Sequence, residues 1–353
     1  MTVYLINLVM MGLYSVGYNL FRLRFANTKK IKCFFVSFAT IQLVVILSLR
    51  HISTGVDVAG YVYNFKYLFP SYSFNQLMAH RWEIGFKLLN KIIYFFTSNE
   101  HIFLSLIAIF SIVPVGIFIY KYSKMPFLSF ALYISFNYYS FTFSGLRQSI
   151  AYGIILISYN FIINKKPFKF VISVLFAALF HKSALIFLPA YFLADLKINK
   201  LSISVILLCD VIIFIFRKQI FQFIVDMFYN NHEVVESSSF RWMLLCIFIL
   251  SYGLFFYKQV IALSKNNNAL YVFLIMGVSL MIFSSVGTNV MRVADYYYMF
   301  VILFIPEVIS VIKDTRLILI GGYILIILIF ILYVWFLQSD GYNIVPYRLF
   351  ISI

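Results

Sequence analysis

Long apolar runs follow one another along almost the whole chain, and short clusters of charged residues separate them. A membrane-spanning helix needs about 20 mostly apolar residues, or about 17 where flanking side chains reach the interface, so the pattern predicts an all-α polytopic integral membrane protein with about 12 transmembrane helices. The predicted spans are residues 3–21, 33–49, 102–120, 126–143, 148–163, 168–180, 184–194, 201–216, 242–257, 269–286, 296–312 and 317–337. We expect residues 1–353 to form a single polytopic membrane domain.

The composition points to lipid, rather than water, as the main solvent. Of the 353 residues, 63% are hydrophobic and only 11% are charged; soluble domains average about 45–50% and about 25%. The net charge of +16 would suggest a nucleic-acid partner in a soluble protein, but in a membrane protein it mostly marks cytoplasmic loops, so no nucleic acid is expected. Cys33, Cys209 and Cys246 stand singly without metal-ligand spacing, so we expect neither a metal nor a cofactor.

The positions of the basic residues predict the orientation of the spans, because short loops rich in Lys and Arg stay in the cytoplasm. One alternating set of loops carries this charge, which places both termini outside. Its residues are Arg22, Arg24, Lys29, Lys30, Lys32, Lys121, Lys124, Lys165, Lys166, Lys169, Lys197, Lys200, Lys258, Lys265, Lys313 and Arg316.

Residues 168–194 form two short apolar halves around His181, Lys182 and Ser183. A single crossing here would move the later basic loops to the outside, so an even number of crossings is preferred. Two short tilted helices and a re-entrant pair both satisfy this requirement, because broken helices are tolerated where they line a polar cavity.

Two external loops are predicted, at residues 50–100 and 217–241. Within the first, residues 82–98 form an amphipathic pattern that is typical of a helix lying in the membrane interface. Its apolar face carries Ile84, Leu88, Leu89, Ile92, Ile93 and Phe96, and its polar face carries Lys87, Asn90, Lys91 and Tyr94. The second loop carries Asp226, His232, Glu233, Glu236 and the run Ser237, Ser238 and Ser239.

Arginine is concentrated on the predicted external side, whereas lysine dominates the cytoplasmic loops. The external arginines are Arg50, Arg81, Arg147, Arg217, Arg241, Arg292 and Arg348. A planar guanidinium suits bidentate recognition of phosphate, so the set favours an anionic external ligand. For any single arginine, the alternative is that its side chain reaches lipid headgroups.

The first external loop opens with Asp57, Tyr61 and Phe65 spaced by four residues. On one short helix these side chains would share a face. Asp57 could then act as a general base at the rim of a cavity, or it could serve only as a helix N-cap with Tyr61 and Phe65 as interfacial anchors.

Short motifs in a fixed order run from the second predicted span to the C-terminus. They are Gly55, Asp57, Tyr61 and Phe65; Glu83, Gly85 and Phe86; Gly145, Leu146, Arg147, Gln148 and Ala151; Phe180, His181, Lys182, Ser183, Ala184, Leu188 and Pro189; Arg292 and Tyr296; and Val345, Pro346 and Tyr347. Together they resemble the EpsG family of Wzy-like bacterial polysaccharide (O-antigen or exopolysaccharide) polymerases. The family-like positions are Asp57, Glu83, Arg147, Gln148, His181, Ser183 and Arg292.

This resemblance implies a glycosyltransferase that joins undecaprenyl-diphosphate-linked oligosaccharide repeat units at the outer face of the bacterial plasma membrane. The implied partners are the lipid-linked oligosaccharide, membrane lipids, and a chain-length regulator and flippase of the same pathway. The chain departs from a typical polymerase in the short external loop at 217–241, which leaves open how a glycan is held.

In such a reaction the leaving group is a lipid diphosphate, whose charge the external arginines would stabilise. A base must take the proton of the acceptor hydroxyl, and Asp57 or His181 could do so. The residues expected to bind substrate are Arg50, Tyr61, Arg81, Glu83, Arg147, Gln148, Ser183, Arg292 and Tyr296.

Other classes of function share parts of this pattern. A membrane glycosyltransferase that uses a polyprenyl-phosphate sugar would differ only in its donor. A lipid-linked oligosaccharide flippase or transporter would need buried arginines along a through-cavity and pseudo-symmetric halves, which the sequence does not display. A purely structural subunit would not explain the external arginines.

Overall fold

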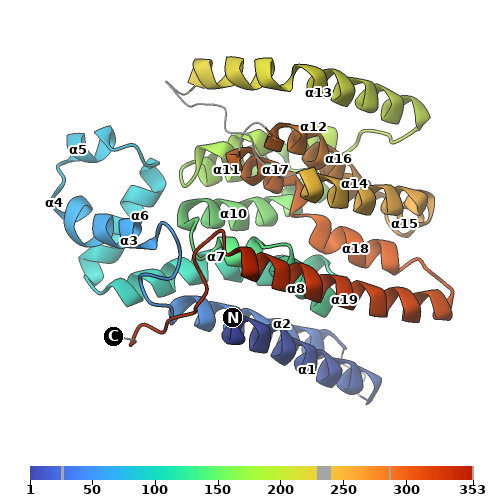
Figure 1. Cartoon of the computed structure of the whole chain (residues 1–353), viewed down its shortest axis with the longest axis horizontal. Helices are drawn as coiled ribbons and strands as arrows, with labels where there is room; N and C mark the ends of the chain where they lie inside the picture. The colour runs from blue at the N-terminus through green and yellow to red at the C-terminus, as the bar shows by residue number, and fades with distance from the viewer. Residues whose placement is uncertain (25–27, 229–239, 286–287, 352–353) are drawn as a thin grey trace. The chain divides into compact units, whose positions relative to one another are not determined.

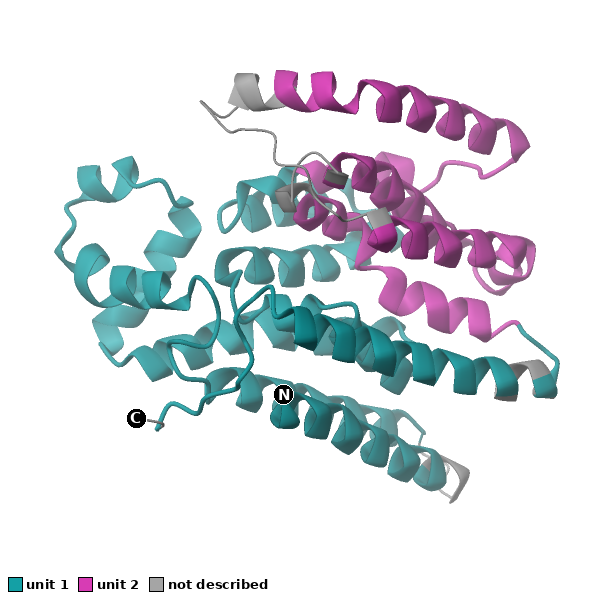
Figure 2. Ribbon diagram, viewed as in Figure 1, with its two compact units in different colours: residues 1–185, 312–353 teal, residues 186–311 magenta. Residues whose placement is uncertain are grey.

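The computed structural model describes residues 1–24, 28–228, 240–285 and 288–351. Within these ranges the chain is helical, and the only β pairing is an isolated bridge between Arg50 and Leu349. The chain divides into two compact units, residues 1–185 with 312–353 and residues 186–311 (Figure 2). The prediction of an all-α protein is therefore confirmed.

The first unit contains a stack of long helices and a set of short helices in the loop after α2. Its elements are α1 (Thr2–Arg24), α2 (Thr28–Ser48), α3 (Val58–Tyr63), the π-helix η1 (Asn64–Leu68), α4 (Phe69–Ser71), α5 (Phe74–Ala79), α6 (Ile84–Phe96), α7 (Glu100–Tyr122), α8 (Pro126–Ser135), α9 (Tyr138–Phe141), α10 (Leu146–Ile163), α11 (Pro167–Ala178) and α19 (Thr315–Ser339). Helix α2 packs on α1 and α7, α7 on α10, and α10 on α11 (Figure 1). The short helices α3–α6 thus extend from the stack between α2 and α7.

Local sequence signals explain where several of these helices begin. The Asn99 side chain accepts hydrogen bonds from the backbone N–H groups of His101 and Ile102, at 2.8 and 3.3 Å, and so caps α7. Helices α8 and α11 each begin with a proline, Pro126 and Pro167, at a position where the missing N–H has no helical acceptor.

The second unit is built around α16. Its elements are α12 (Ala190–Leu193), α13 (Lys200–Phe228), α14 (Phe240–Phe255), α15 (Tyr257–Leu263), the 3₁₀ helix η3 (Lys265–Asn267), α16 (Asn268–Met281), the 3₁₀ helix η4 (Ile282–Ser285), α17 (Thr288–Tyr298) and α18 (Val301–Ile309). Helix α16 packs against α14, α17 and α18. Aromatic residues fill this core, where the rings of Phe187 and Phe300 stack at 5.7 Å and the ring of Phe273 lies 4.8 Å from that of Phe300.

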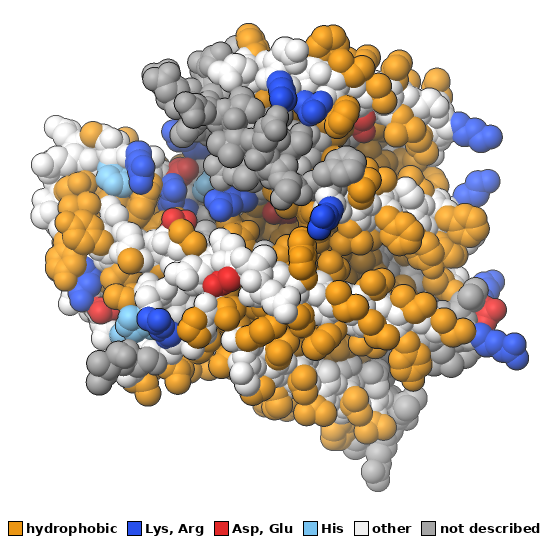
Figure 3. Space-filling model, in the orientation of Figure 1, with side chains coloured by type: hydrophobic (Ala, Val, Ile, Leu, Met, Phe, Trp, Pro, Cys, Tyr) orange, Lys and Arg blue, Asp and Glu red, His pale blue; other side chains and the backbone are white. Residues whose placement is uncertain are grey.

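Six helices of the described residues are long and apolar enough to cross a membrane, or up to seven if the bent pair 241–255 and 257–263 is one span. The six are 2–21, 28–48, 100–122, 146–163, 265–284 and 320–339. Much of the apolar surface of 2–21, 28–48 and 320–339 is exposed, as expected for lipid contact, whereas 146–163 and 265–284 are mostly buried within the protein. Hydrophobic side chains cover much of the face in Figure 3. The chain is thus a multi-pass membrane protein, and the count of twelve spans stays a prediction.

Several predicted spans are shorter or broken in the structure. Residues 126–143 are divided between α8 and α9, because Asn137 adopts a left-handed conformation with φ of 65°. Residues 168–194 are divided between α11, the 3₁₀ helix η2 (Lys182–Phe187) and α12, with a break at His181. The break agrees with the sequence pattern, and the choice between two crossings and a re-entrant pair stays open.

The predicted amphipathic segment forms helix α6, but the face that packs against the protein includes polar residues as well as Phe86 and Ile93. Lys87 and Asn90 are buried, whereas the exposed fractions of Ile92, Phe95 and Phe96 are 58%, 83% and 79%. An exposed apolar face is what a helix in the membrane interface requires. In the second predicted loop, α13 continues to Phe228, and residues 229–239 lie outside the described residues.

Candidate functional site

The loop that follows α2 is fixed by the C-terminal segment 340–350. Backbone N–H groups of His51, Gly55 and Val56 donate to the carbonyls of residues 348, 343 and 342, at 2.8, 2.9 and 3.1 Å, and the N–H of Phe350 donates to Leu49 at 2.9 Å. Gly55 has a φ of 112°, and a Cβ there would lie 2.2 Å from the carbonyl oxygen of Phe143. Only glycine fits this turn, which leads directly to Asp57.

An ion pair between Glu83 and Arg147 forms the centre of the site. Nη1 of Arg147 donates to Oε2 of Glu83, and Nε donates to the hydroxyl of Tyr61 at 3.4 Å. The other carboxylate oxygen of Glu83 accepts from the backbone N–H of Lys182 at 3.2 Å. The pair is largely enclosed, with 9% of the Glu83 side chain and 20% of the Arg147 side chain exposed.

Aromatic rings support the guanidinium of Arg147. It lies over the ring of Trp82 at 5.1 Å, and the Trp82 ring packs against Tyr61 at 4.9 Å and Phe86 at 5.8 Å. Burial raises the pKa of the Tyr61 phenol, although Arg147 opposes the shift, so the phenol stays protonated at neutral pH. These contacts fix the guanidinium in one orientation.

His181 and Ser183 flank Lys182, whose backbone N–H donates to Glu83. His181 Nδ1 and Ser183 Oγ are 2.6 Å apart. The segment is held close to Glu83, because the N–H of Gly85 donates to the carbonyl of Leu179 at 2.8 Å, and a Cβ on Gly85 would lie 2.7 Å from that oxygen. The start of α6 and the end of α11 therefore approach so closely that glycine is required at position 85.

Asp57 lies at the N-cap of α3, as the sequence allowed, but its side chain makes no capping hydrogen bond. Its carboxylate is exposed, whereas Tyr61 and Phe65 are buried, with exposed fractions of 5% and 0%. Phe65 stacks on Phe103 at 4.3 Å and belongs to the core. Asp57 and Phe65 thus differ in environment although the spacing suggested one shared face.

The remaining predicted site residues have other surroundings. Arg50 is fully buried under the C-terminal segment, with its guanidinium 5.3 Å from the ring of Phe143. The Gln148 side chain donates to the hydroxyl of Tyr152 within α10 at 2.9 Å. Arg81 is exposed. Arg292, which is half-buried, and Tyr296, which is buried, belong to α17 of the second unit.

Two groups at the site were missed by the sequence analysis. The backbone N–H of Lys182 carries no sequence signal, because any residue except proline supplies it. Lys87 is buried, and its ammonium donates to the carbonyls of Leu77 at 2.5 Å and His80 at 3.0 Å, which holds α5 and the segment before Trp82 against α6. The sequence signal for Lys87 was its position on the polar face of the predicted amphipathic helix.

The EpsG family model matches residues 33–349 of the chain, which includes every residue of the ion-pair centre. The chain belongs to the EpsG family. This family is associated with polysaccharide polymerases and glycosyltransferase-like proteins, so the chain has a polysaccharide polymerase-like role in a membrane. Comparisons with curated proteins and with solved structures returned no match.

Within the EpsG match, the ion-pair centre joins residues from four of the short motifs: Tyr61, Glu83, Arg147 and Lys182. These positions are spread over more than a hundred residues of sequence. Such a convergence makes the Glu83–Arg147 centre the strongest candidate for a functional site in the first unit.

Proposed function

We propose that this EpsG-family protein is a polysaccharide polymerase, a membrane glycosyltransferase that joins undecaprenyl-diphosphate-linked oligosaccharide repeat units at the outer face of the bacterial plasma membrane. The observation that carries the proposal is the Glu83–Arg147 pair, to which Tyr61 and Lys182 also contribute. A guanidinium that is already oriented suits recognition of a diphosphate.

Arg147 is proposed to bind the diphosphate of the donor. In the structure its Nη1 is paired with Glu83, so a phosphate oxygen would replace or share that carboxylate. The exchange of one anion for another keeps the guanidinium paired, which lowers the cost of desolvating it. Arg292 of the second unit is proposed as a further diphosphate ligand, on its family-like position alone.

The proposed reaction transfers the growing glycan from its lipid diphosphate to an acceptor hydroxyl. The acceptor oxygen forms a bond to the anomeric carbon, and the bond from that carbon to the diphosphate oxygen breaks. Arg147 stabilises the negative charge that develops on the leaving diphosphate, as preorganised donors do in other transfer reactions.

Asp57 is proposed to take the acceptor proton, with His181 as the alternative base. Asp57 has an exposed carboxylate at the start of α3, whereas Glu83 is engaged by two donors. A general base must reach the acceptor proton, and an exposed carboxylate can do so without breaking an existing ion pair. His181 already has Ser183 Oγ at 2.6 Å, which would orient its ring.

A deletion of the gene tests the proposed function, with the surface glycan separated by size on a gel. A polymerase defect leaves single repeat units on the cell surface, which is the expected result. A flippase defect would leave no surface repeat units, and loss of one sugar would shorten the repeat unit itself. Either of these outcomes would overturn the assignment as a polymerase.

A further inference from the structure

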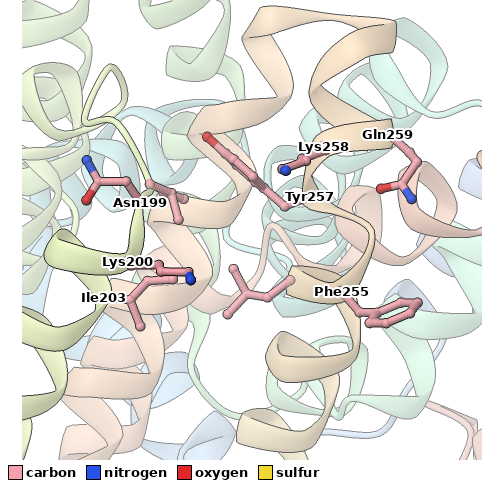
Figure 4. Close-up of a pocket in the computed structure, with 9 residues that line it drawn as sticks. Asn199, Lys200, Ile203, Phe255, Tyr257, Lys258 and Gln259 are labelled. Atoms are coloured by element: carbon pink, nitrogen blue, oxygen red, sulfur yellow. The ribbon is translucent and has the colours of Figure 1, made fainter.

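The second unit contains a cavity of about 460 Å³ at the bend between α14 and α15, next to the start of α13 (Figure 4). The two helices of this bend meet at 67°. Nine residues line the cavity, and none of them is acidic. The volume is sufficient for a small ligand or the headgroup of a lipid.

Two lysines give the cavity a positive charge. The ammonium groups of Lys200 and Lys258 point toward the space between them from two different helices (Figure 4). Both side chains are exposed, and neither has an ion-pair partner among the described residues. Lys200 is also the first residue of the 29-residue helix α13, whose N-terminus adds positive partial charge at the same place.

Four of the other lining residues are apolar, beside the polar side chains of Asn199, Tyr257 and Gln259. Ile198, Ile203, Leu254 and Phe255 line the cavity, and 79% of the Phe255 side chain is exposed. A site for a fully hydrated anion would not need this apolar surface. The combination of two ammonium groups and a partly apolar wall instead matches an amphiphile with an anionic head.

The cavity is held in shape by the side chain of Asn268. Its Oδ1 accepts from the hydroxyl of Tyr257 at 2.9 Å, and its Nδ2 donates to the carbonyls of Ala194 and Leu196, both at 2.9 Å. One side chain thus connects α15, the start of α16 and the segment that leads into α13. Such a preformed wall reduces the ordering cost of binding.

We propose that this cavity binds the phosphate-bearing headgroup of an anionic phospholipid, with Lys200 and Lys258 as its ligands. The loop charges predict that this end of the unit faces the cytoplasm, where anionic headgroups attract basic segments. A lipid headgroup and a soluble phosphate would both offer a phosphate to the two lysines. The apolar part of the wall favours the lipid as the source. The site shares no residue with the Glu83–Arg147 centre, and its occupation does not depend on the polymerase assignment.

Binding can be measured on the full-length protein in nanodiscs, with phosphatidylglycerol in a phosphatidylcholine background and lipid retention read by native mass spectrometry. Each lysine next to an anionic headgroup contributes about fivefold to affinity. The double variant Lys200→Ala with Lys258→Ala should therefore bind phosphatidylglycerol about 25-fold more weakly. Lys200→Arg with Lys258→Arg should keep most of the affinity.

The matched control is Lys197→Ala with Lys265→Ala, which removes the same charge from exposed residues that do not line the cavity. It should bind within twofold of the unmodified protein. Equal losses in both double variants would show general charge attraction and overturn the site. Competition by glycerol phosphate as strong as that by phosphatidylglycerol would overturn the lipid as its source. Thermal unfolding without added lipid verifies that all variants are folded.

Discussion

Replacement of Arg147 by lysine separates the charge of this side chain from its shape. The guanidinium makes three contacts: Nη1 with Glu83, Nε with the hydroxyl of Tyr61 at 3.4 Å, and its face with the Trp82 ring at 5.1 Å. A lysine ammonium can keep the pair with Glu83, but it has neither a second donor in the same plane nor a face to stack. The variant therefore keeps the ion pair but loses the planar pair of donors that the guanidinium offers to a phosphate.

The expected loss is large in rate and small in stability. Removal of one preorganised donor to a developing negative charge costs about 10² to 10³ in rate, so we expect Arg147→Lys to polymerise about 100-fold more slowly. The contact with Trp82 stabilises the fold by about 0.5–1 kcal/mol, as for a cation over a partly exposed ring, which is too little to unfold a protein of ordinary stability. Abundance in the membrane should therefore be unchanged.

The assay measures glycan polymer formed by membranes of a deletion strain that carries each variant, normalised to protein abundance by immunoblot. Arg348→Lys is the control, because the Arg348 side chain is exposed and only its backbone carbonyl bonds to His51. This control should be as active as the unmodified protein. If the rate of glycan polymerisation by Arg147→Lys is within twofold of that rate, the planar pair of donors is not required and the role given to Arg147 is wrong.

Three further predictions concern the base, the topology and the response to pH. Asp57→Asn should slow polymerisation by about 10² to 10⁴ at unchanged abundance, whereas a loss of only a few-fold together with a severe loss in His181→Gln would move the base to His181. The Lys265→Cys variant should not be labelled at position 265 by an impermeant thiol reagent added from outside. Labelling there would mean that residues 168–194 cross the membrane an odd number of times. Burial and then Lys87 lower the pKa of His80, whose Nδ1 accepts from the N–H of Trp82 at 3.2 Å. Because the fold favours neutral His80, this segment should lose stability as the pH falls below about 6.5. The loss should change the fluorescence of Trp82, and His80→Asn should remove that change. The same pH response in His80→Asn would contradict the assignment to His80.

The sequence predicted the helices better than it predicted what each face contacts. Helix α6 formed where the period of apolar residues indicated, but Lys87 and Asn90 face the protein and Ile92 and Phe96 face outward. A hydrophobic period shows that a helix has two unlike faces. It does not show which face meets protein when the surrounding solvent is lipid, because lipid can cover the apolar face equally well.

The candidate site was partly predictable for a similar reason. The motifs identified Glu83, Arg147 and Tyr61, and the structure brings them together. Arg50 looked the same as Arg147 in the sequence, since both are external arginines at the end of an apolar run. Its burial depends on the C-terminal segment, a contact between distant parts of the chain that no local pattern records.

Buried Arg50 shows how the same residue type can meet very different surroundings in one fold. Among the described residues, none of its three guanidinium nitrogens has a hydrogen-bond partner, and burial lowers its pKa to about 10. It remains charged at neutral pH, and its guanidinium lies over the ring of Phe143 at 5.3 Å. Its burial places this guanidinium in the packing beneath the loop, and its role in substrate binding stays a prediction.

The C-terminal segment helps to fix the backbone that leads to Asp57. Four backbone hydrogen bonds connect residues 49–56 with residues 342–350. Fixing a residue costs about 1–2 kcal/mol in backbone entropy, and each hydrogen bond returns only about 0.5–1.5 kcal/mol net. The bonds alone therefore cannot order the loop, and buried contacts must supply the rest, including the Tyr4 hydroxyl that donates to Ile344 at 2.8 Å. It follows that the backbone at Asp57 depends on packing of the last residues of the first unit, although its carboxylate stays exposed for chemistry.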